Sequence, residues 1–297
     1  MQRVLVAGAT GYLGGFVVRV LKDRGYSVRA LVRSLRKAGG LPDIADEVVV
    51  GQVTNPETLK EVCDNIDVVF SSVGITRQKD GLSFHDVDYR GNLNLLHAAQ
   101  RAGVKRVVYV SVFGGPGLRH LDIVDAHEAF ADELRASGID FTVLRPTGYF
   151  SDMGELLTMA RKGRVWLIGD GTNRVNPIHG ADLAVACADA VEGGASEMDI
   201  GGPEAMTWNE AAELAFDAVG RPAKITHVPE RLMWFLVRLV RLVNRHQGEL
   251  LAFFTTAATT NVSAPAAGSH TLARHFSELL EQGTAKEKVC HSSIARS

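Results

Sequence analysis

The sequence has few cysteines, no excess of basic residues and no long apolar run. Only three of its 297 residues are cysteine, and Cys63, Cys187 and Cys290 lie too far apart for the spacings of metal-binding motifs. We therefore expect buried or free thiols, no metal centre and a reducing, cytoplasmic location. The net charge of −2 argues against a nucleic-acid partner, because nucleic-acid-binding domains usually carry a strongly basic balance.

The sequence also lacks the patterns typical of a membrane-spanning or secretory segment. No run of about 18 uncharged apolar residues occurs. The first predicted strand follows Met1-Gln2-Arg3 directly, which leaves no room for a signal peptide. Hydrophobic residues nevertheless make up 46% of the chain, enough to bury one large core or two smaller ones.

The most specific pattern lies in the first fifteen residues. The apolar run Val4–Ala7 predicts a strand, the segment GATGYLG (8–14) follows it, and apolar residues then recur at helical spacing. In such a unit the first glycine allows the turn, the second lets backbone N–H groups approach a pyrophosphate, and the third lets helix and strand pack closely. The pattern predicts a dinucleotide site with its phosphates at the helix N-terminus, the alternative being an ordinary glycine-rich turn.

The end of the second predicted strand, Ser27–Val32, indicates which dinucleotide binds. NAD-binding folds usually place an acidic residue there to hold the ribose 2′-OH. This chain has Arg33, followed by Arg36 and Lys37. Because an arginine fork suits the 2′-phosphate of NADP, we expect NADP(H) in preference to NAD(H). A solvated basic loop is the alternative.

Strand and helix signals alternate through residues 1–150. This order predicts an α/β Rossmann fold with a doubly wound parallel sheet, in which ligands bind beyond the carboxyl ends of the strands. One connecting helix is predicted over Pro56–Ile66. Residues 151–285 are interpreted as a smaller substrate- or partner-covering portion, from which about 176–202 returns to the Rossmann sheet. The tail, 286–297, is expected to fray.

Together these features resemble the atypical and extended short-chain dehydrogenase/reductases, most closely their NmrA-like branch. The resemblance covers about residues 1–220. The matching segments are the turn at 8–14, LVR (31–33), VDYRGNLNLLHAA (87–99), VVYVS (107–111), SGI and TVLRP (137–146), and NPIHGADL (176–183). Beyond these, GP (202–203) with TW (207–208) is similar to members from chloroplasts and cyanobacteria that assist photosystem assembly.

The resemblance implies a set of cofactor contacts. The cofactor-binding residues it predicts are Gly8, Thr10, Gly11, Tyr12, Leu13, Gly14, Arg33, Lys37, Gln52, Val53, Val73, Gly74, Pro146, Thr147 and Gly148. The turn would hold the pyrophosphate, Arg33 and Lys37 the 2′-phosphate, and the segment from Pro146 would approach the nicotinamide. Gln52, which would flank the adenine with Val53, stands where the family usually has an acidic residue, and its amide can still hydrogen-bond adenine.

The catalytic positions depart further from the family pattern. Catalytic members use a serine, a tyrosine and, four residues after the tyrosine, a lysine. Ser111 fits the serine position, but His127 stands at the lysine position and Ile123 at the tyrosine position. The candidate catalytic residues are therefore Ser111, His127 and Tyr149. Each also has a structural alternative: a strand-end hydroxyl, a histidine filling space at a helix start, and an aromatic ring used for packing.

Two functions from different classes follow. An NADP(H)-dependent oxidoreductase would move a hydride between the nicotinamide and a small, largely apolar carbonyl, enone or quinone. A non-catalytic NADP(H)-sensing regulator or assembly factor would keep the fold without the proton relay, and the missing tyrosine and lysine favour it. A reductase that acts on a C=C bond without a protein tyrosine is also compatible with the sequence.

The segment RLMWFLVRLVRLVNRH (231–246) predicts an amphipathic helix. Its four arginines fall on one narrow face, and apolar residues cover most of the remainder. So wide an apolar surface is normally buried. The helix would therefore cap the substrate pocket or pack in a subunit interface such as that of a homodimer. The alternative is contact with a membrane surface or with an apolar partner.

Overall fold

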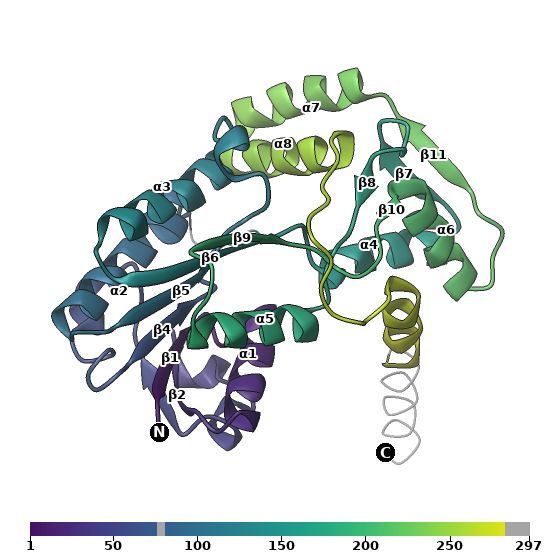
Figure 1. Cartoon of the computed structure of the whole chain (residues 1–297). Helices are drawn as coiled ribbons and strands as arrows, with labels where there is room; N and C mark the ends of the chain where they lie inside the picture. Colours follow the sequence, from purple (N-terminus) through teal and green to yellow (C-terminus); the bar gives the residue numbers. More distant parts are fainter. Residues whose placement is uncertain (76–80, 283–297) are drawn as a thin grey trace, which may run out of the picture.

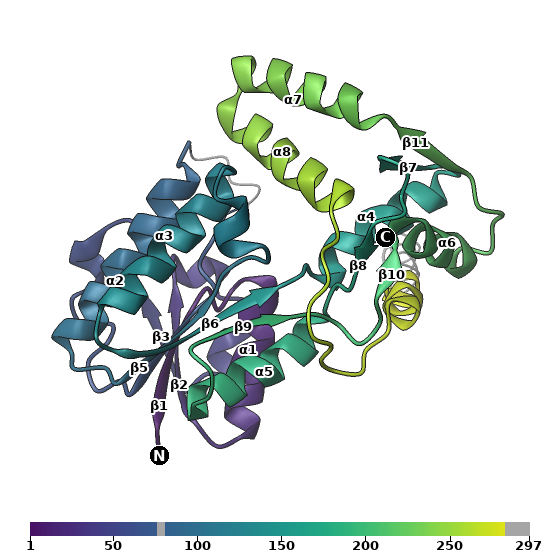
Figure 2. The same cartoon turned by 45° about the horizontal axis from the view of Figure 1, so that its top comes forward.

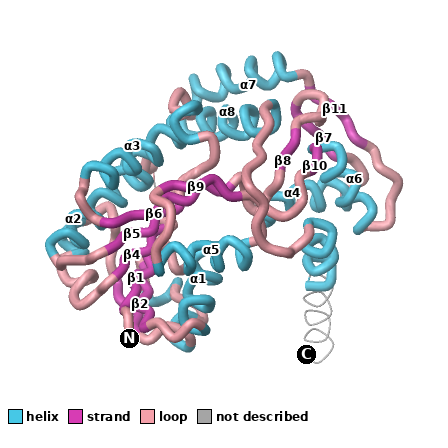
Figure 3. The backbone as a smooth tube through the Cα atoms, viewed as in Figure 1, coloured by secondary structure: helices cyan, strands magenta, loops and turns pink. Residues whose placement is uncertain are grey.

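The computed structural model describes residues 1–75 and 81–282, and a parallel sheet of seven strands lies at its centre (Figure 1; magenta in Figure 3). The strand order is β3-β2-β1-β4-β5-β6-β9. The strands are β1 (Arg3–Ala7), β2 (Ser27–Val32), β3 (Glu47–Val50), β4 (Val68–Ser71), β5 (Arg106–Val110), β6 (Asp140–Pro146) and β9 (Glu197–Ile200). Every neighbouring pair is parallel, which confirms the predicted Rossmann-type α/β fold.

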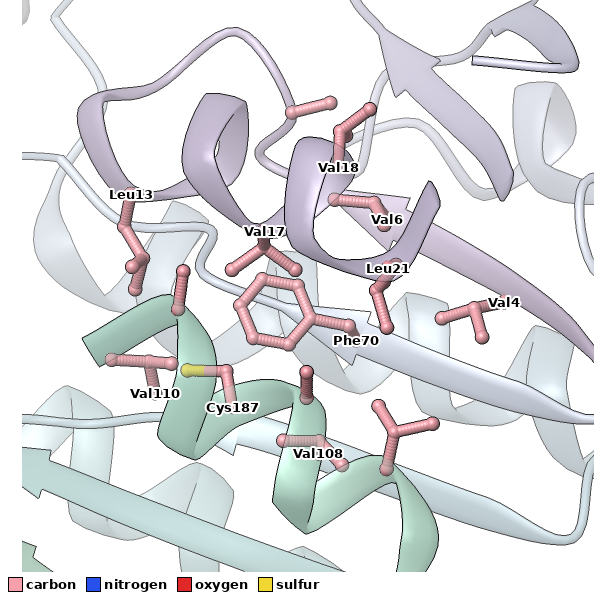
Figure 4. Packing of buried hydrophobic residues seen from close by; sticks show 14 of the residues in the cluster. Val4, Val6, Leu13, Val17, Val18, Leu21, Phe70, Val108, Val110 and Cys187 are labelled. Carbon is pink, nitrogen blue, oxygen red and sulfur yellow. The ribbon is translucent and has the colours of Figure 1, made fainter. Parts of the chain in front are cut away.

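Helices cover both faces of this sheet, so its strands are apolar on both sides. Helices α1 (Tyr12–Asp23) and α5 (Gly180–Glu192) pack on one face, and α2 (Arg90–Arg101) and α3 (Asp122–Ala136) on the other. In Figure 4 the side chains of Val17 and Leu21 from α1 meet Phe70 of β4 and Cys187 of α5. Alternate residues of β1 point to the two layers, so the sheet separates two hydrophobic clusters, one on each face.

The predicted thiols are free and buried where the structure describes them. Cys63 and Cys187 are both buried, and burial raises the pKa of each. Cys290 lies outside the described residues.

The helix predicted over Pro56–Ile66 is wrong. Only a short 3-10 helix, Pro56–Leu59, forms there, and the Asn55 side chain accepts a hydrogen bond from the N–H of Glu57 at its start. The chain then continues in turns, and Asn65 adopts a φ of 57°, which no α-helix accommodates. Its apolar residues reach the sheet from successive turns, and this produces the same periodicity as a helix face.

A second, smaller cluster of elements packs beside the sheet. It comprises α4 (Phe150–Arg161), β7 (Val165–Ile168), β8 (Arg174–Val175), β10 (Met206–Thr207), α6 (Trp208–Ala218) and β11 (Ile225–Val228). Its own core includes Phe150, Phe216 and Phe276, the last from a helical stretch at 272–282. Between these elements the chain returns to the main sheet as α5 and β9.

The single helix predicted over 231–246 is two helices. Helix α7 (Glu230–Val243) ends at Asn244, which has φ −146° and ψ 102°, and α8 (Arg245–Thr259) begins there. The Asn244 side chain accepts a hydrogen bond from the N–H of Gln247 at 3.0 Å and so caps α8. Figure 2 shows the resulting α7–α8 hairpin standing off the sheet. Among the described residues, no helix combines the length and apolarity needed to cross a membrane.

Candidate functional site

The turn between β1 and α1 is built on close backbone packing. Gly8 has φ +85°, and its carbonyl accepts a hydrogen bond from the N–H of Gly11 at 2.8 Å. A Cβ on Gly14 would lie 2.1 Å from the Gly8 oxygen, so only glycine lets the helix begin directly against the turn. The N-cap, Gly11, has no side chain to bond the first N–H groups of α1, and this leaves the helix N-terminus suited to an anion.

A cleft opens at the carboxyl ends of the first four strands. Eight of the predicted cofactor-binding residues line it: Gly8, Thr10, Gly11, Arg33, Gln52, Val53, Val73 and Gly74. The sequence prediction missed the other lining residues, Leu31, Gly51, Thr54, Ser72, Ile75, Leu82 and Val87. The cleft therefore joins the glycine turn, the end of β2, the turn after β3 and the loop after β4 in one space.

Arg33 contributes an exposed cation to this cleft. It follows β2 directly, and within residues 1–75 and 81–282 its guanidinium forms no ion pair. Lys37, at the end of the 3-10 helix Leu35–Lys37, is also exposed but is not part of the cleft wall. Gln52 is held near the mouth by its own amide, which donates to the Thr54 hydroxyl at 3.0 Å.

Tyr12, Leu13 and Gly14 support the turn from behind. Leu13 is buried in the core, and the Tyr12 hydroxyl accepts a hydrogen bond from the N–H of Gly180 at 3.1 Å. Burial raises the pKa of Tyr12. The Tyr12 ring also meets that of Tyr149 edge to face, with centroids 5.8 Å apart. These side chains fix α1 against α5 and are not part of the cleft wall.

The segment Pro146–Gly148 links β6 to the returning chain. The N–H of Thr147 donates to the Ile200 carbonyl at 3.0 Å, and its hydroxyl donates to the Asn176 carbonyl at 2.6 Å. The Gly148 carbonyl accepts from the N–H of Ile178 at 2.9 Å. These three predicted residues lie at the carboxyl edge of the sheet but outside the described cleft wall.

His127 lies in a buried hydrogen-bond chain. Its Nδ1 is 2.5 Å from the Tyr109 hydroxyl, and its Nε2 is 3.1 Å from the Asp88 carboxylate. Burial raises the pKa of Asp88, although the hydrogen bond with His127 opposes this, and burial raises the pKa of Tyr109 well above its ordinary value. Both ring nitrogens of His127 therefore have protein partners.

This chain of hydrogen bonds reaches the cleft beside Gly74. A Cβ on Gly74 would lie 3.0 Å from the Asp88 Oδ1 and 3.6 Å from the His127 Cε1. Asp88 also accepts hydrogen bonds from the N–H of Ile75 at 3.3 Å. The His85–Tyr89 segment, which carries Asp88, is a π-helix, a form that often marks functional sites.

Asn92 fixes the same loop from α2. Its amide donates to the carbonyls of Val73 at 3.1 Å and Asp88 at 2.8 Å, and its oxygen accepts from the Ser71 hydroxyl at 2.6 Å. The loop after β4 is thus held by two polar side chains on one stretch of helix, Asp88 and Asn92.

Ser111 belongs to a different buried cluster. Its hydroxyl donates to Glu128 at 3.1 Å, and Glu128 accepts two hydrogen bonds from the Arg145 guanidinium, each 2.8 Å long. Arg145 also pairs with Glu197 at 2.8 Å. Hydrogen bonds from Arg135 and Arg145 lower the pKa of Glu197 to about 2, against the opposing effect of burial.

Tyr149 packs as part of the core. It is half-buried at the N-cap of α4, and burial raises its pKa. The three candidate catalytic side chains therefore contact three different sets of protein groups: Glu128 for Ser111, Tyr109 and Asp88 for His127, and Tyr12 for Tyr149. Their catalytic roles stay predictions.

The sequence profile of a family described as NAD(P)H-binding matches residues 8–193, more than half of the chain. The chain belongs to this NAD(P)H-binding family. The resemblance to the atypical short-chain dehydrogenase/reductases is thereby confirmed. Binding of NAD(P)H is the property by which this family is described.

Curated relatives span two kinds of protein. The photosystem II assembly factor Ycf39 of Synechocystis is 31% identical over 81% of this chain and 74% of its own length. The divinyl chlorophyllide a 8-vinyl-reductase of Zea mays is 29% identical over 98% of this chain and 82% of its own.

Two solved structures share the fold. The NADPH-dependent quinone oxidoreductase QOR2 of Escherichia coli, complexed with NADPH, has a TM-score of 0.75 at 20% identity, covering 93% of this chain and 99% of that one. The Citrobacter triphenylmethane reductase complexed with NADP(H) has a TM-score of 0.73 at 21% identity, with the same coverage. At such identity the likeness concerns the fold.

The residues of the cleft fit an NAD(P)H dinucleotide. Close packing in the glycine turn, where a Cβ on Gly8 or Gly14 would collide with neighbouring protein atoms, starts α1 directly at the cleft, and the uncapped N-terminus of this helix suits a pyrophosphate. Arg33 provides a free cation at the end of β2, and the Gln52 side chain lies in the turn after β3. Each group stands where a Rossmann fold needs it for phosphates, ribose and adenine.

The structure also shows functional groups that the sequence prediction missed. Asp88 and Asn92 are four residues apart within the segment VDYRGNLNLLHAA, a spacing that places two polar side chains on one helix face. The sequence therefore contained a signal for this pair. Tyr109 and Glu128 carried none, because a tyrosine inside an apolar strand and a glutamate on a helix look like ordinary residues.

Proposed function

We propose that this protein is an NADP(H)-dependent reductase of a small, apolar acceptor such as a quinone or an enone. The observation that carries the proposal is the cleft in which the glycine turn faces the same space as Arg33, which has no ion pair among residues 1–75 and 81–282. When bound, NADPH supplies a hydride. The roles below belong to side chains and backbone groups of this chain.

The preference for NADP(H) rests on Arg33. The N-terminus of α1 would bind the pyrophosphate through its free N–H groups. The Arg33 guanidinium would bind the 2′-phosphate through two parallel hydrogen bonds. Since no acidic residue takes its place at the end of β2, the ribose 2′-OH of NAD would lack its usual acceptor.

The class of acceptor follows from the other end of the cleft. The loop after β4 and the segment beside it contribute Val73, Ile75, Leu82 and Val87, an apolar wall that suits an apolar ligand. Both ring nitrogens of His127 are engaged by protein groups. His127 is therefore not free to donate a proton to the acceptor. Quinones and enones suit such a site better than a carbonyl that needs a tyrosine as its acid, because their reduced forms readily take up a proton from solvent.

A second candidate function has its own support. Ser111 and His127 are both bonded to buried acidic side chains, and this is compatible with an NADP(H)-sensing regulator or assembly factor without chemistry. The relative Ycf39 is a photosystem II assembly factor. The two functions differ in whether bound NADPH is consumed.

The test follows the absorbance of bound NADPH at 340 nm while quinones, enones and aldehydes are added in turn. A reductase oxidises NADPH with at least one quinone or enone, and the rate saturates with acceptor. If NADPH binds tightly but no acceptor in the panel oxidises it, the sensor or assembly function replaces the reductase.

Substitution of Arg33 by alanine should weaken NADPH binding by about 10- to 150-fold. The estimate corresponds to roughly 1.5–3 kcal/mol, the usual contribution of hydrogen bonds to a charged group. NADH, which has no 2′-phosphate, should bind the variant and the wild type equally. Fluorescence titration of both cofactors measures the effect. The substitution Arg36→Ala is the matched control, because that arginine is not part of the cleft wall. Equal NADPH affinity in Arg33→Ala and wild type would refute the role of Arg33.

A further inference from the structure

Helix α7 exposes an apolar face that no described part of the chain covers. The large apolar residues on this face, with the exposed fraction of each, are Leu232 (48%), Phe235 (56%), Leu236 (38%), Leu239 (44%), Leu242 (84%) and Val243 (90%). At 100° per residue they lie opposite Val237, the one fully buried residue of α7. An apolar surface of this kind on a folded protein marks an interaction site.

The opposite side of α7 is firmly held. Val237 belongs to a buried cluster with Ala252 of α8 and Ile75 of the loop after β4. Arg241 pairs with Glu249 of α8 at 2.9 Å. The hairpin is also tied to α3 through a 3.0 Å ion pair between Arg245 and Asp122. The exposed face is therefore displayed in a fixed orientation.

Two free arginines flank the apolar face. Arg231 and Arg238 are exposed, lie two helical turns apart along one edge of the face, and form no ion pair within the described residues. Residues 230–259 contain four arginines against two glutamates, whereas the whole chain has a net charge of −2. Because Arg241 and Arg245 already pair with Glu249 and Asp122, the cationic character of this surface comes from Arg231 and Arg238.

We propose that α7 docks this protein on a membrane surface that carries anionic lipid headgroups. An amphipathic helix lies in the plane of such a surface, with its apolar face among the upper acyl chains and its basic residues near the headgroup phosphates. With 14 residues, α7 is about 21 Å long, shorter than the ~30 Å hydrocarbon core, and so suits the surface and not a crossing.

A second copy of the chain fits the surface less well. An antiparallel pair of α7 helices would place the Arg231 and Arg238 edges of both copies on the same side of the contact. The only acidic residue of α7, Glu230, lies on the side of Val237 and accepts a hydrogen bond from the Trp234 indole at 3.1 Å. It leaves the arginine edges without a neutralising partner.

The experiment is flotation of the full-length protein with vesicles. One set contains phosphatidylcholine alone, and the other contains phosphatidylcholine with phosphatidylglycerol. We expect binding to the anionic vesicles, weakened by added salt because surface charges are screened. The double variant Arg231→Gln/Arg238→Gln should bind about 30-fold more weakly, since each basic residue near an anionic surface contributes about 1 kcal/mol, or roughly fivefold.

The apolar contribution is tested with Phe235→Asp/Leu239→Asp. This variant should lose vesicle binding at least tenfold, while Val185→Asp, a matched change at an exposed position of α5, should bind like wild type. Circular dichroism verifies that each variant is folded. NADPH affinity, measured on the same samples, should be unchanged, so this proposal and the proposed function fail independently.

Two results would overturn the docking proposal. One is a wild-type protein that floats with neither kind of vesicle at low salt. The other is a dimer in light scattering that Phe235→Asp/Leu239→Asp converts to a monomer, which would make the face a contact between copies of this chain.

Discussion

Replacing Gly14 with alanine should abolish measurable NADPH binding and destabilise the fold. The new methyl group would lie 2.1 Å from the Gly8 carbonyl oxygen and 2.8 Å from the Ala9 Cα, both backbone atoms that cannot move aside. Either α1 shifts away from the turn or the turn opens, and both displace the N–H groups that face the pyrophosphate. Overpacking of this kind costs about 1–3 kcal/mol of stability, and we expect more than a hundredfold loss of NADPH affinity.

The neighbouring Gly15 supplies the control. It lies in the same helix, but a Cβ there would meet only the Ala9 oxygen, at 4.0 Å. Gly15→Ala should therefore bind NADPH normally and gain up to about 1 kcal/mol, because alanine favours helix more than glycine does. Isothermal titration and thermal unfolding measure both variants. Similar NADPH affinities for the two would contradict the close packing of turn and helix as the basis of the site.

Replacing Arg145 with methionine should cost about 3–5 kcal/mol in the free energy of unfolding. Glu128 is fully buried, and its bidentate partner is Arg145, itself 5% exposed. Without that guanidinium the nearest cation is Arg135 at 3.7 Å, and the Ser111 hydroxyl donates the remaining hydrogen bond. A buried charge that loses its partner retains its desolvation cost, which is the physical source of the loss. Urea denaturation measures it.

A double variant separates this cause from simple loss of packing. Arg145→Met/Glu128→Leu removes both charges and should recover at least half of the lost stability. The control Arg274→Met breaks an exposed pair with Glu278, one helical turn away, and should change stability by less than about 0.5 kcal/mol. If the double variant is no more stable than Arg145→Met alone, the unpaired carboxylate is not the cause.

The parts of the fold that sequence predicts well are those with a strictly local cause. Strand β2 matches the predicted Ser27–Val32 residue for residue, because a largely buried run bounded by turns has little alternative to a parallel strand. Helix α7 shows the limit. The face that carries its arginines continues to Arg245 in the sequence, and the backbone of Asn244 ends the helix and reverses the chain before that residue.

The candidate site likewise has parts that the sequence predicts and parts that it does not. The glycine turn and Arg33 belong to short segments whose geometry is determined within a few residues, and the cleft contains both. The hydrogen-bond chain behind Gly74 joins the π-helix, β5 and α3 through Asp88, Tyr109 and His127, which are far apart in sequence. Because these three residues come from separate segments, no local sequence pattern predicts that they meet. Only the fold brings them together.

The most direct test of the central claim is a parallel titration of the wild-type protein with NADPH and with NADH. We expect NADPH to bind at least tenfold more tightly, because NADH has no 2′-phosphate to pair with Arg33 at the end of β2. Equal affinities, or tighter binding of NADH, would contradict the assignment of this cleft to NADP(H).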